Sequence, residues 1–141
     1  MAFLLDTCVV SELTKHHPEP NVTEWFSRQT PESLFLSSIT TGEIRRGIER
    51  LPISRRRNSI ESWFWSLKDE YISRIVSFDM VASEIWGRLK ADSEKLGMRK
   101  SDTDLQIAAI AIQHGHVLAT RIIKDFRDTG VNIIDPWTFG S

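Results

Sequence analysis

The sequence begins with a short apolar run, Ala2-Phe3-Leu4-Leu5, that ends abruptly at Asp6. A continuous apolar run of this length, bounded by polar residues, is typical of a strand buried on both faces of a parallel sheet. In open α/β sheets the functional crevice lies outside the carboxyl ends of the strands. We therefore expect Asp6 to face that crevice, together with whatever other polar residues reach the same edge.

Similar apolar runs recur along the chain, and amphipathic stretches with helical spacing separate them. The further expected strands cover residues 34–36, 75–76, 117–119 and 131–134. The stretch from Leu105 to Ile112 is almost entirely apolar, which predicts a helix buried in the middle of the fold. Strands that alternate with helices indicate a parallel sheet with helices on both faces. We expect one α/β domain over residues 1–141, with three layers and a central parallel sheet of about five strands.

Composition limits the classes of function. The chain has 18 Lys and Arg against 19 Asp and Glu, a formal net charge of −1, so any affinity for nucleic acid must come from local basic patches or a bound metal ion. A single cysteine, Cys8, cannot form an internal disulfide, and we expect no signal segment before the first strand. The longest apolar runs are far below the ~20 residues that span a bilayer, so we expect a cytoplasmic protein without membrane contact.

Acidic residues stand where several of these elements meet the functional edge. They are Asp6 after the first strand, Glu43 in the first turn of the helix after the second strand, Asp104 at the start of the buried helix, and Asp125 after the fourth strand. Carboxylates ~4 Å apart repel one another by on the order of 4 kcal/mol at an effective dielectric near 20, so such a cluster needs a counter-cation. Hard oxygen ligands without paired cysteines favour Mg²⁺ or Mn²⁺, which would activate water for phosphodiester hydrolysis.

Each acid also has a purely structural interpretation, because acids at strand ends and helix N-termini act as caps. The joint placement of four acids favours the metal site. Asp102 competes with Asp104, but the apolar helix pattern begins directly after Asp104. Thr40 or Thr41 is the expected N-cap of the helix that carries Glu43. Thr7 and Ser38 are candidates either for hydrogen bonds to the carboxylates or for simple caps.

Several motifs along the chain resemble PIN-domain ribonucleases, and most closely the VapC toxins of prokaryotic toxin–antitoxin pairs. They are Leu4-Leu5-Asp6-Thr7, Thr40-Thr41-Gly42-Glu43-Ile44 with Arg46-Gly47-Ile48, Asp104 with Ile107-Ala108-Ala109, Ala119-Thr120-Arg121 with Asp125-Phe126, and Gly130-Val131 leading to Pro136-Trp137. The resemblance implies a PIN-like α/β/α fold and a Mg²⁺-dependent endoribonuclease. It also implies a homodimer that a cognate antitoxin blocks and that reaches operator DNA only through the antitoxin. By motif position Asp6, Glu43 and Asp104 match the metal-binding acids, and Asp125 matches the second acid of the later motif.

Two positions depart from the family pattern. Cys8 stands where the family commonly has Asn, and Ile122 stands where an Asn or Asp usually belongs to the active-site edge. Isoleucine cannot bind a metal ion, so Asp125 would carry the fourth-acid role alone. The alternative is a catalytically weakened module that acts mainly through its complex with antitoxin and operator DNA.

Basic and aromatic residues suggest where RNA and a partner would bind. Arg121, Lys100 and Arg46 are the candidates for contacts with substrate phosphates, although arginines on the helix after Glu43 also fit a solvated face. The aromatic run 63–65 is too dense for one buried helix face, so at least one of its side chains is expected at a partner surface. A rival interpretation makes Asp6 the nucleophile of a phosphatase, but Thr7-Cys8 supply no second acid beside it.

Overall fold

The computed structural model describes residues 1–140, and its centre is a five-stranded parallel sheet with the strand order β3-β2-β1-β4-β5. The strands are β1 (Phe3–Leu5), β2 (Leu34–Ser37), β3 (Ile75–Val76), β4 (Val117–Ala119) and β5 (Ile133–Ile134). β1 pairs with β2 on one side and with β4 on the other, and all three of its residues are buried. The expected parallel sheet, with the first strand covered on both faces, is confirmed.

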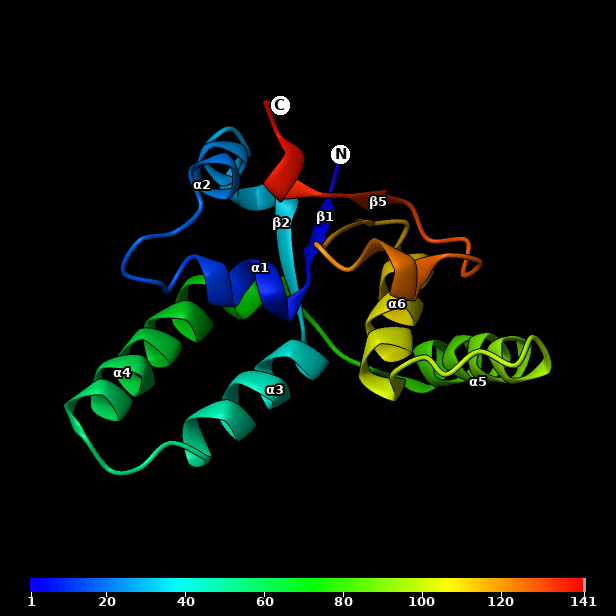
Figure 1. The fold of residues 1–141 in the computed structure, drawn as a ribbon, viewed down its shortest axis with the longest axis horizontal. Helices are drawn as coiled ribbons and strands as arrows, with labels where there is room; N and C mark the ends of the chain where they lie inside the picture. Colours follow the sequence, from blue (N-terminus) through cyan, green and yellow to red (C-terminus); the bar gives the residue numbers. More distant parts are fainter. Residues whose placement is uncertain (141) are drawn as a thin grey trace.

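Helices cover both faces of this sheet. They are α1 (Thr7–Glu12), α2 (Pro20–Ser27), α3 (Ser38–Glu49), α4 (Arg55–Glu70), α5 (Met80–Lys95) and α6 (Asp102–His114), and the 3₁₀ turns are η1 (Pro31–Ser33), η2 (Ile72–Arg74), η3 (Ile123–Phe126) and η4 (Pro136–Thr138). Figure 1 shows α1 to α4 on one side of the sheet and α5 and α6 on the other. No helix within residues 1–140 is long and apolar enough to cross a membrane.

The alternation of side chains along β1 creates two separate cores. Phe3 and Leu5 pack with the buried residues of α1 to α4, whereas Leu4 packs with those of α6. Residues 107–111 of α6 are all fully buried, so the expected central helix is confirmed, and it ends at Gly115 in the left-handed conformation (φ 66°). The sheet and α6 therefore form a rigid frame for the residues at the carboxyl edge.

The start of α3 differs from the expectation. Ser37, the last residue of β2, caps the helix, because its Oγ accepts a hydrogen bond from the Thr40 N–H at 3.0 Å. The chain therefore enters the helix directly from the strand, without the loop that a cap at Thr40 or Thr41 requires. Glu43 consequently lies in the second turn of α3 rather than the first.

Candidate active site

The four acids predicted from sequence belong to separate elements that meet at the carboxyl edge of the sheet. Asp6 follows β1, Glu43 lies on α3, Asp104 lies in the first turn of α6 and Asp125 belongs to η3. Their charges act on one another, since Asp6, Asp125 and Glu43 all raise the pKa of Asp104. The fold thus brings the predicted cluster together.

Asp6 is the most buried of these acids, with only 3% of its surface exposed. Its carboxylate accepts hydrogen bonds from the Thr7 N–H at 2.8 Å and from the Thr120 hydroxyl at 2.7 Å, and the Cys8 thiol lies 3.6 Å away. Burial raises the pKa of Asp6, and the charge of Asp125 adds to this, while the hydrogen bonds from Thr120 and Thr7 oppose it. These hydrogen bonds hold the Asp6 side chain in place, but burial makes its ionised form less favourable.

The pKa of Asp104 is raised to about 7. Burial is the main cause, followed by the charges of Asp6 and Asp125, a hydrogen-bonding contact with Asp125, and the charge of Glu43. Like charges that share one site cannot all ionise without compensation. Near neutral pH the cluster therefore retains a proton or takes up a cation. Asp102 points elsewhere, since it is exposed and pairs with Lys90 at 2.9 Å, so Asp104 is the acid of the cluster.

Glu43 is held by a hydroxyl group from a different helix. The Thr7 hydroxyl donates to Glu43 Oε1 at 2.6 Å, so the expected bond from Thr7 to a carboxylate is present. Ser38 behaves differently, because its Oγ accepts a hydrogen bond from the Phe78 N–H at 3.0 Å. As the first residue of α3, Ser38 anchors the segment before α5, and among residues 1–140 its side chain has no described bond to a carboxylate.

Thr120 is a residue of the site that the sequence analysis did not single out. It is fully buried, it donates to Asp6, and its Oγ1 accepts a hydrogen bond from the Ile122 N–H at 3.1 Å. Its place directly after β4, at the same edge as Asp6, was the available signal. Ile122 itself is 37% exposed, so its side chain is not part of the packed core.

The basic residues divide into two groups. Arg121 is exposed, with its guanidinium 5.3 Å from the centre of the Trp137 ring, and Arg46 is exposed on α3. The ammonium group of Lys100 instead donates to the backbone carbonyl of Arg127, which ties together two loops. Arg45 pairs with Glu61 at 2.9 Å and so fastens α3 to α4. Arg121 and Arg46 therefore remain the better candidates for substrate contacts.

The carboxylate oxygens of the cluster are suitable ligands for a hard divalent cation, although the side chains are not arranged as a complete metal site. Within residues 1–140 no group of three or more His, Cys, Asp or Glu side chains is arranged to hold a metal ion. The four acids nevertheless offer only carboxylate oxygens, the ligands that Mg²⁺ and Mn²⁺ prefer. Burial, followed by the charges of the neighbouring carboxylates, raises the pKa of Asp104, and a bound cation would favour its ionised form. Asp6, Glu43, Asp104 and Asp125 thus suit such an ion by the type of their ligand atoms.

Fold and site together define a small α/β protein with an acidic site at the carboxyl edge of a parallel sheet. The chain belongs to the PIN-domain family, whose sequence pattern matches residues 3–129. This membership accounts for the motifs found between residues 3 and 129.

Comparisons with individual proteins agree with this family. The chain is 38% identical to the plasmid stability protein StbB of Pseudomonas syringae pv. tomato over 95% of this chain and 97% of that protein. It is 36% identical to VapC ribonuclease Y4jK of Sinorhizobium fredii, covering 95% and 96%. The crystal structure of FitAcB from Neisseria gonorrhoeae superposes with a TM-score of 0.91 at 30% identity, covering 97% and 99% of the two chains.

Proposed function

We propose that this chain is a Mg²⁺- or Mn²⁺-dependent endoribonuclease, the toxin of a toxin–antitoxin pair. The observation that carries the proposal is the convergence of four carboxyl groups, whose charges add to the effect of burial in raising the pKa of Asp104 to about 7. The similarity to VapC ribonuclease Y4jK supports RNA as the substrate. A cytoplasmic location follows from an RNA substrate and a cognate antitoxin made in the same cell.

Each part of the site has a role in this reaction. Asp6, Glu43, Asp104 and Asp125 would hold the ion, which when bound supplies Lewis-acid stabilisation of the charge that develops on the phosphate. The Thr120 hydroxyl and the Thr7 N–H fix the orientation of Asp6.

We expect arginine side chains near the acid cluster to bind the RNA. Arg121 and Arg46 would pair with phosphate oxygens of the strand. Because the whole chain has a net charge of −1, these cations must supply the attraction for RNA.

The proposal is tested by titrating the purified, antitoxin-free protein with Mn²⁺ in a calorimeter and following cleavage of a mixed cellular RNA pool in parallel. We expect saturable binding below millimolar Mn²⁺ and cutting at discrete sites that EDTA abolishes. Cleavage that continues undiminished in EDTA would contradict the metal dependence.

A second candidate function follows from Ile122. The resemblance described above implies Asn or Asp at this position, whereas here the backbone N–H of Ile122 donates to Thr120, which in turn donates to Asp6. A weakened site would leave complex formation with antitoxin and operator DNA as the main role. Absence of both Mn²⁺ binding at millimolar concentration and RNA cutting would favour this second function over the nuclease.

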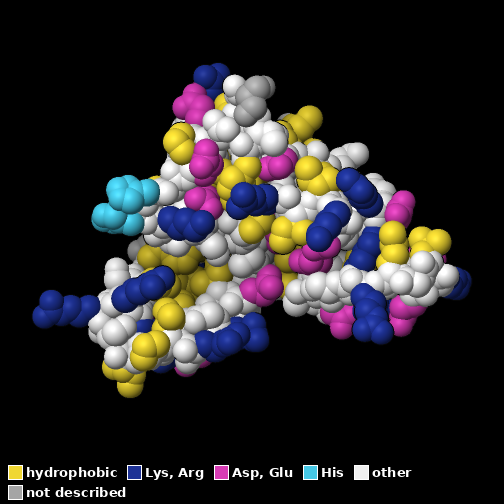
Figure 2. Space-filling model, in the orientation of Figure 1, with side chains coloured by type: hydrophobic (Ala, Val, Ile, Leu, Met, Phe, Trp, Pro, Cys, Tyr) yellow, Lys and Arg dark blue, Asp and Glu magenta, His cyan; other side chains and the backbone are white. Residues whose placement is uncertain are grey.

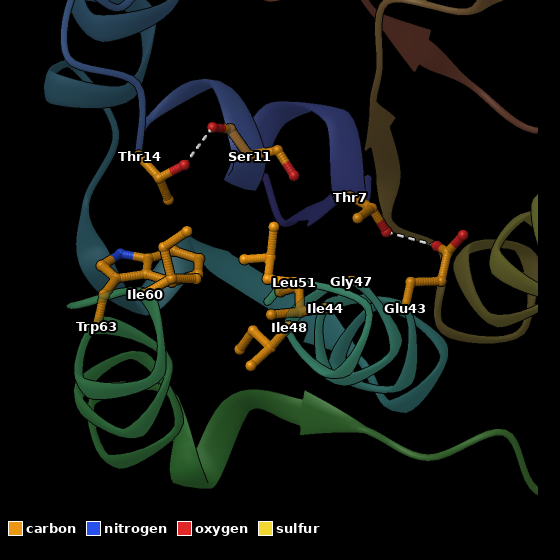
Figure 3. Close-up of a pocket in the computed structure, with 10 residues that line it drawn as sticks. All are labelled: Thr7, Ser11, Thr14, Glu43, Ile44, Gly47, Ile48, Leu51, Ile60 and Trp63. Carbon is orange, nitrogen blue, oxygen red and sulfur yellow. Dashed lines mark hydrogen bonds between the residues drawn. The ribbon is translucent and has the colours of Figure 1, made fainter. Parts of the chain in front are cut away.

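The surface proposed for the antitoxin is an apolar groove that begins at the acid cluster. It has a volume of about 200 Å³ and lies between α1, α3 and α4. Figure 3 shows Ile44, Ile48, Ile60 and Trp63 along it, with the Thr7–Glu43 hydrogen bond at one end. In Figure 2 hydrophobic side chains gather in the hollow between α1 and the α3–α4 pair. An amphipathic antitoxin segment would bury its apolar side chains here.

Filling this groove is expected to weaken antitoxin binding. Gly47 lines the groove, and a Cβ added there has no atom within 4 Å, so Gly47→Arg introduces a long side chain at the groove without a clash at its Cβ. We expect the dissociation constant for the cognate antitoxin to rise on the order of 100-fold, because the arginine would occupy the space in which apolar side chains of the antitoxin pack. The measurement is calorimetric titration with the antitoxin encoded beside this chain.

Gly87→Arg is the matched control, since Gly87 lies on α5 on the other side of the sheet and is equally unobstructed. It should bind the antitoxin as the unaltered protein does, and both variants should unfold at similar temperatures. An unchanged dissociation constant for Gly47→Arg would exclude this groove as the antitoxin site.

A further inference from the structure

A buried row of hydroxyl groups leads from the end of β2 to the Glu43 carboxylate. Ser37, Thr40 and Glu43 are spaced three residues apart, so their side chains share one face at the start of α3. Ser37 and Thr40 are both fully buried. Ser37 Oγ lies 3.2 Å from Thr40 Oγ1, which lies 3.1 Å from Thr7 Oγ1, and Thr7 reaches Glu43 Oε1 at 2.6 Å.

The hydroxyl donors of this row converge on Thr40 and Glu43. The Ser37 and Thr7 hydroxyls both donate to Thr40 Oγ1, and the Thr7 hydroxyl also donates to Glu43 Oε1. A carboxylate only accepts hydrogen bonds, and Thr7 has one hydroxyl proton, so Thr7 shares this proton between Thr40 and Glu43. Ser37 is itself held by the Thr40 N–H, which donates to its Oγ at 3.0 Å. Thr40 Oγ1 and Glu43 Oε1 therefore fix the Thr7 hydroxyl from two sides.

The length of the Thr7–Glu43 bond agrees with Thr7 as the donor to this carboxylate. A hydroxyl that donates to a carboxylate makes a short, charge-assisted bond of roughly 2.5–2.7 Å, and the observed 2.6 Å lies in that range. Bonds in such a row polarise one another, and removal of the Thr40 hydroxyl takes away one of the two partners that fix the orientation of the Thr7 hydroxyl. Thr40 is the link that connects the cap of α3 to the side chain on α1, although it has no direct bond to Glu43.

We propose that Thr40 is a positioning residue for Glu43, and that the row Ser37–Thr40–Thr7 orients this carboxylate for a divalent cation. The inference rests on the proposed metal-dependent function. The proposal gives a role to the buried hydroxyl groups of Ser37 and Thr40, which the acid cluster alone does not require. It also assigns the α3 hydroxyl that acts on the site to Thr40 instead of Ser38. Glu43, in the second turn of α3, thereby becomes linked to the N-terminus of α1, beside Asp6.

The test uses variants that change the hydroxyl without changing the shape of the side chain. Thr40→Val removes the hydroxyl and keeps the branched form, whereas Thr40→Ser keeps the hydroxyl. Thr41→Val is the matched control, because the Thr41 hydroxyl bonds to the Ser38 carbonyl, outside the row. We expect Thr40→Val to weaken Mn²⁺ binding about 10-fold in calorimetry, Thr40→Ser to stay within about 3-fold, and Thr41→Val to show no change.

A crystal structure of metal-free Thr40→Val supplies a readout that is independent of activity. We expect the Glu43 carboxylate to leave the Thr7 hydroxyl or to occupy more than one conformation. Unaltered Mn²⁺ affinity together with an unmoved Glu43 would overturn the proposal. If Thr40→Val does not fold, Thr7→Val at the half-buried end of the row must weaken Mn²⁺ binding at least as much, and normal binding by that variant would also overturn it.

The experiment separates this inference from the proposed function. If the unaltered protein binds no Mn²⁺, the metal-dependent function fails, and the metal-free structures alone decide whether Thr40 positions Glu43. A displaced Glu43 in Thr40→Val, with Glu43 in place in Thr41→Val, supports the row of hydroxyl groups. A Glu43 that stays in place in both variants refutes it.

Discussion

Replacing Asp104 with asparagine is expected to lower the rate of metal-dependent RNA cleavage on the order of 10²- to 10³-fold while the fold is retained. Asn keeps the size of the side chain in the first turn of α6 but removes the charge that a divalent cation needs. The other charges of the cluster, on Asp6, Asp125 and Glu43, remain. Initial cleavage rates at saturating Mn²⁺ and the Mn²⁺ affinity from calorimetry measure the effect.

Asp102→Asn is the matched control for this variant. Asp102 lies two positions earlier in the same helix, and its only described ion pair, with Lys90, is at the surface. Cleavage by Asp102→Asn should stay within about 2-fold of the unaltered rate, because an exposed pair contributes little. If Asp104→Asn cleaves RNA as well as Asp102→Asn does, Asp104 is not part of the reacting site.

The second large effect is a loss of stability of the metal-free protein as the pH rises. Asp104 has an ordinary pKa of 3.8 and a folded-state pKa of about 7, so between these values the folded protein binds more protons than the unfolded chain. The free energy of unfolding therefore falls as the pH rises from about 4 to about 7. The shift alone corresponds to at most about 4 kcal/mol, and because Asp104 is only partly buried, solvent screening reduces the expected loss to about 1–3 kcal/mol.

Denaturant unfolding in EDTA at a series of pH values measures this loss. In Asp104→Asn the asparagine has no charge to accommodate, so the slope between pH 4 and pH 7 should flatten and the variant should be more stable than the unaltered protein at pH 7.5. Added Mn²⁺ should restore stability to the unaltered protein at pH 7.5 but not to Asp104→Asn. Equal pH slopes for the two proteins would show that Asp104 does not carry the excess charge of the cluster.

The sequence alone determined the elements whose burial pattern is local. The apolar run before Asp6 indicated a strand covered on both faces, and the unbroken apolar stretch of α6 indicated a central helix. Side chains return to the same face every two residues in a strand and about every 3.6 residues in a helix, so an apolar run without polar positions is buried on all sides. The order of strands and helices then placed Asp6, Glu43, Asp104 and Asp125 at one edge. The resemblance to PIN domains rested on the same residues.

The hydrogen-bond partner of each polar group depends on the tertiary structure. Ser37, rather than Thr40 or Thr41, caps α3, because β2 continues directly into the helix. Ser37, Thr40 and Thr41 all have hydroxyl groups that can cap a helix. Ser37 is the cap because β2 ends at this residue. Lys100 bonds to the Arg127 carbonyl for a similar reason, since the fold brings two distant loops together.

The hydrogen bonds that orient the acids depend most on tertiary structure. Thr120 bonds to Asp6 across 114 positions of sequence, and Thr7 lies beside Thr40 across 33 positions. No periodicity within one segment encodes such pairs, because they form only when parallel strands align and bring separate helix ends together. Local patterns therefore determined which acids reach the active-site edge, and the packing of the sheet determined which hydroxyl groups hold them there.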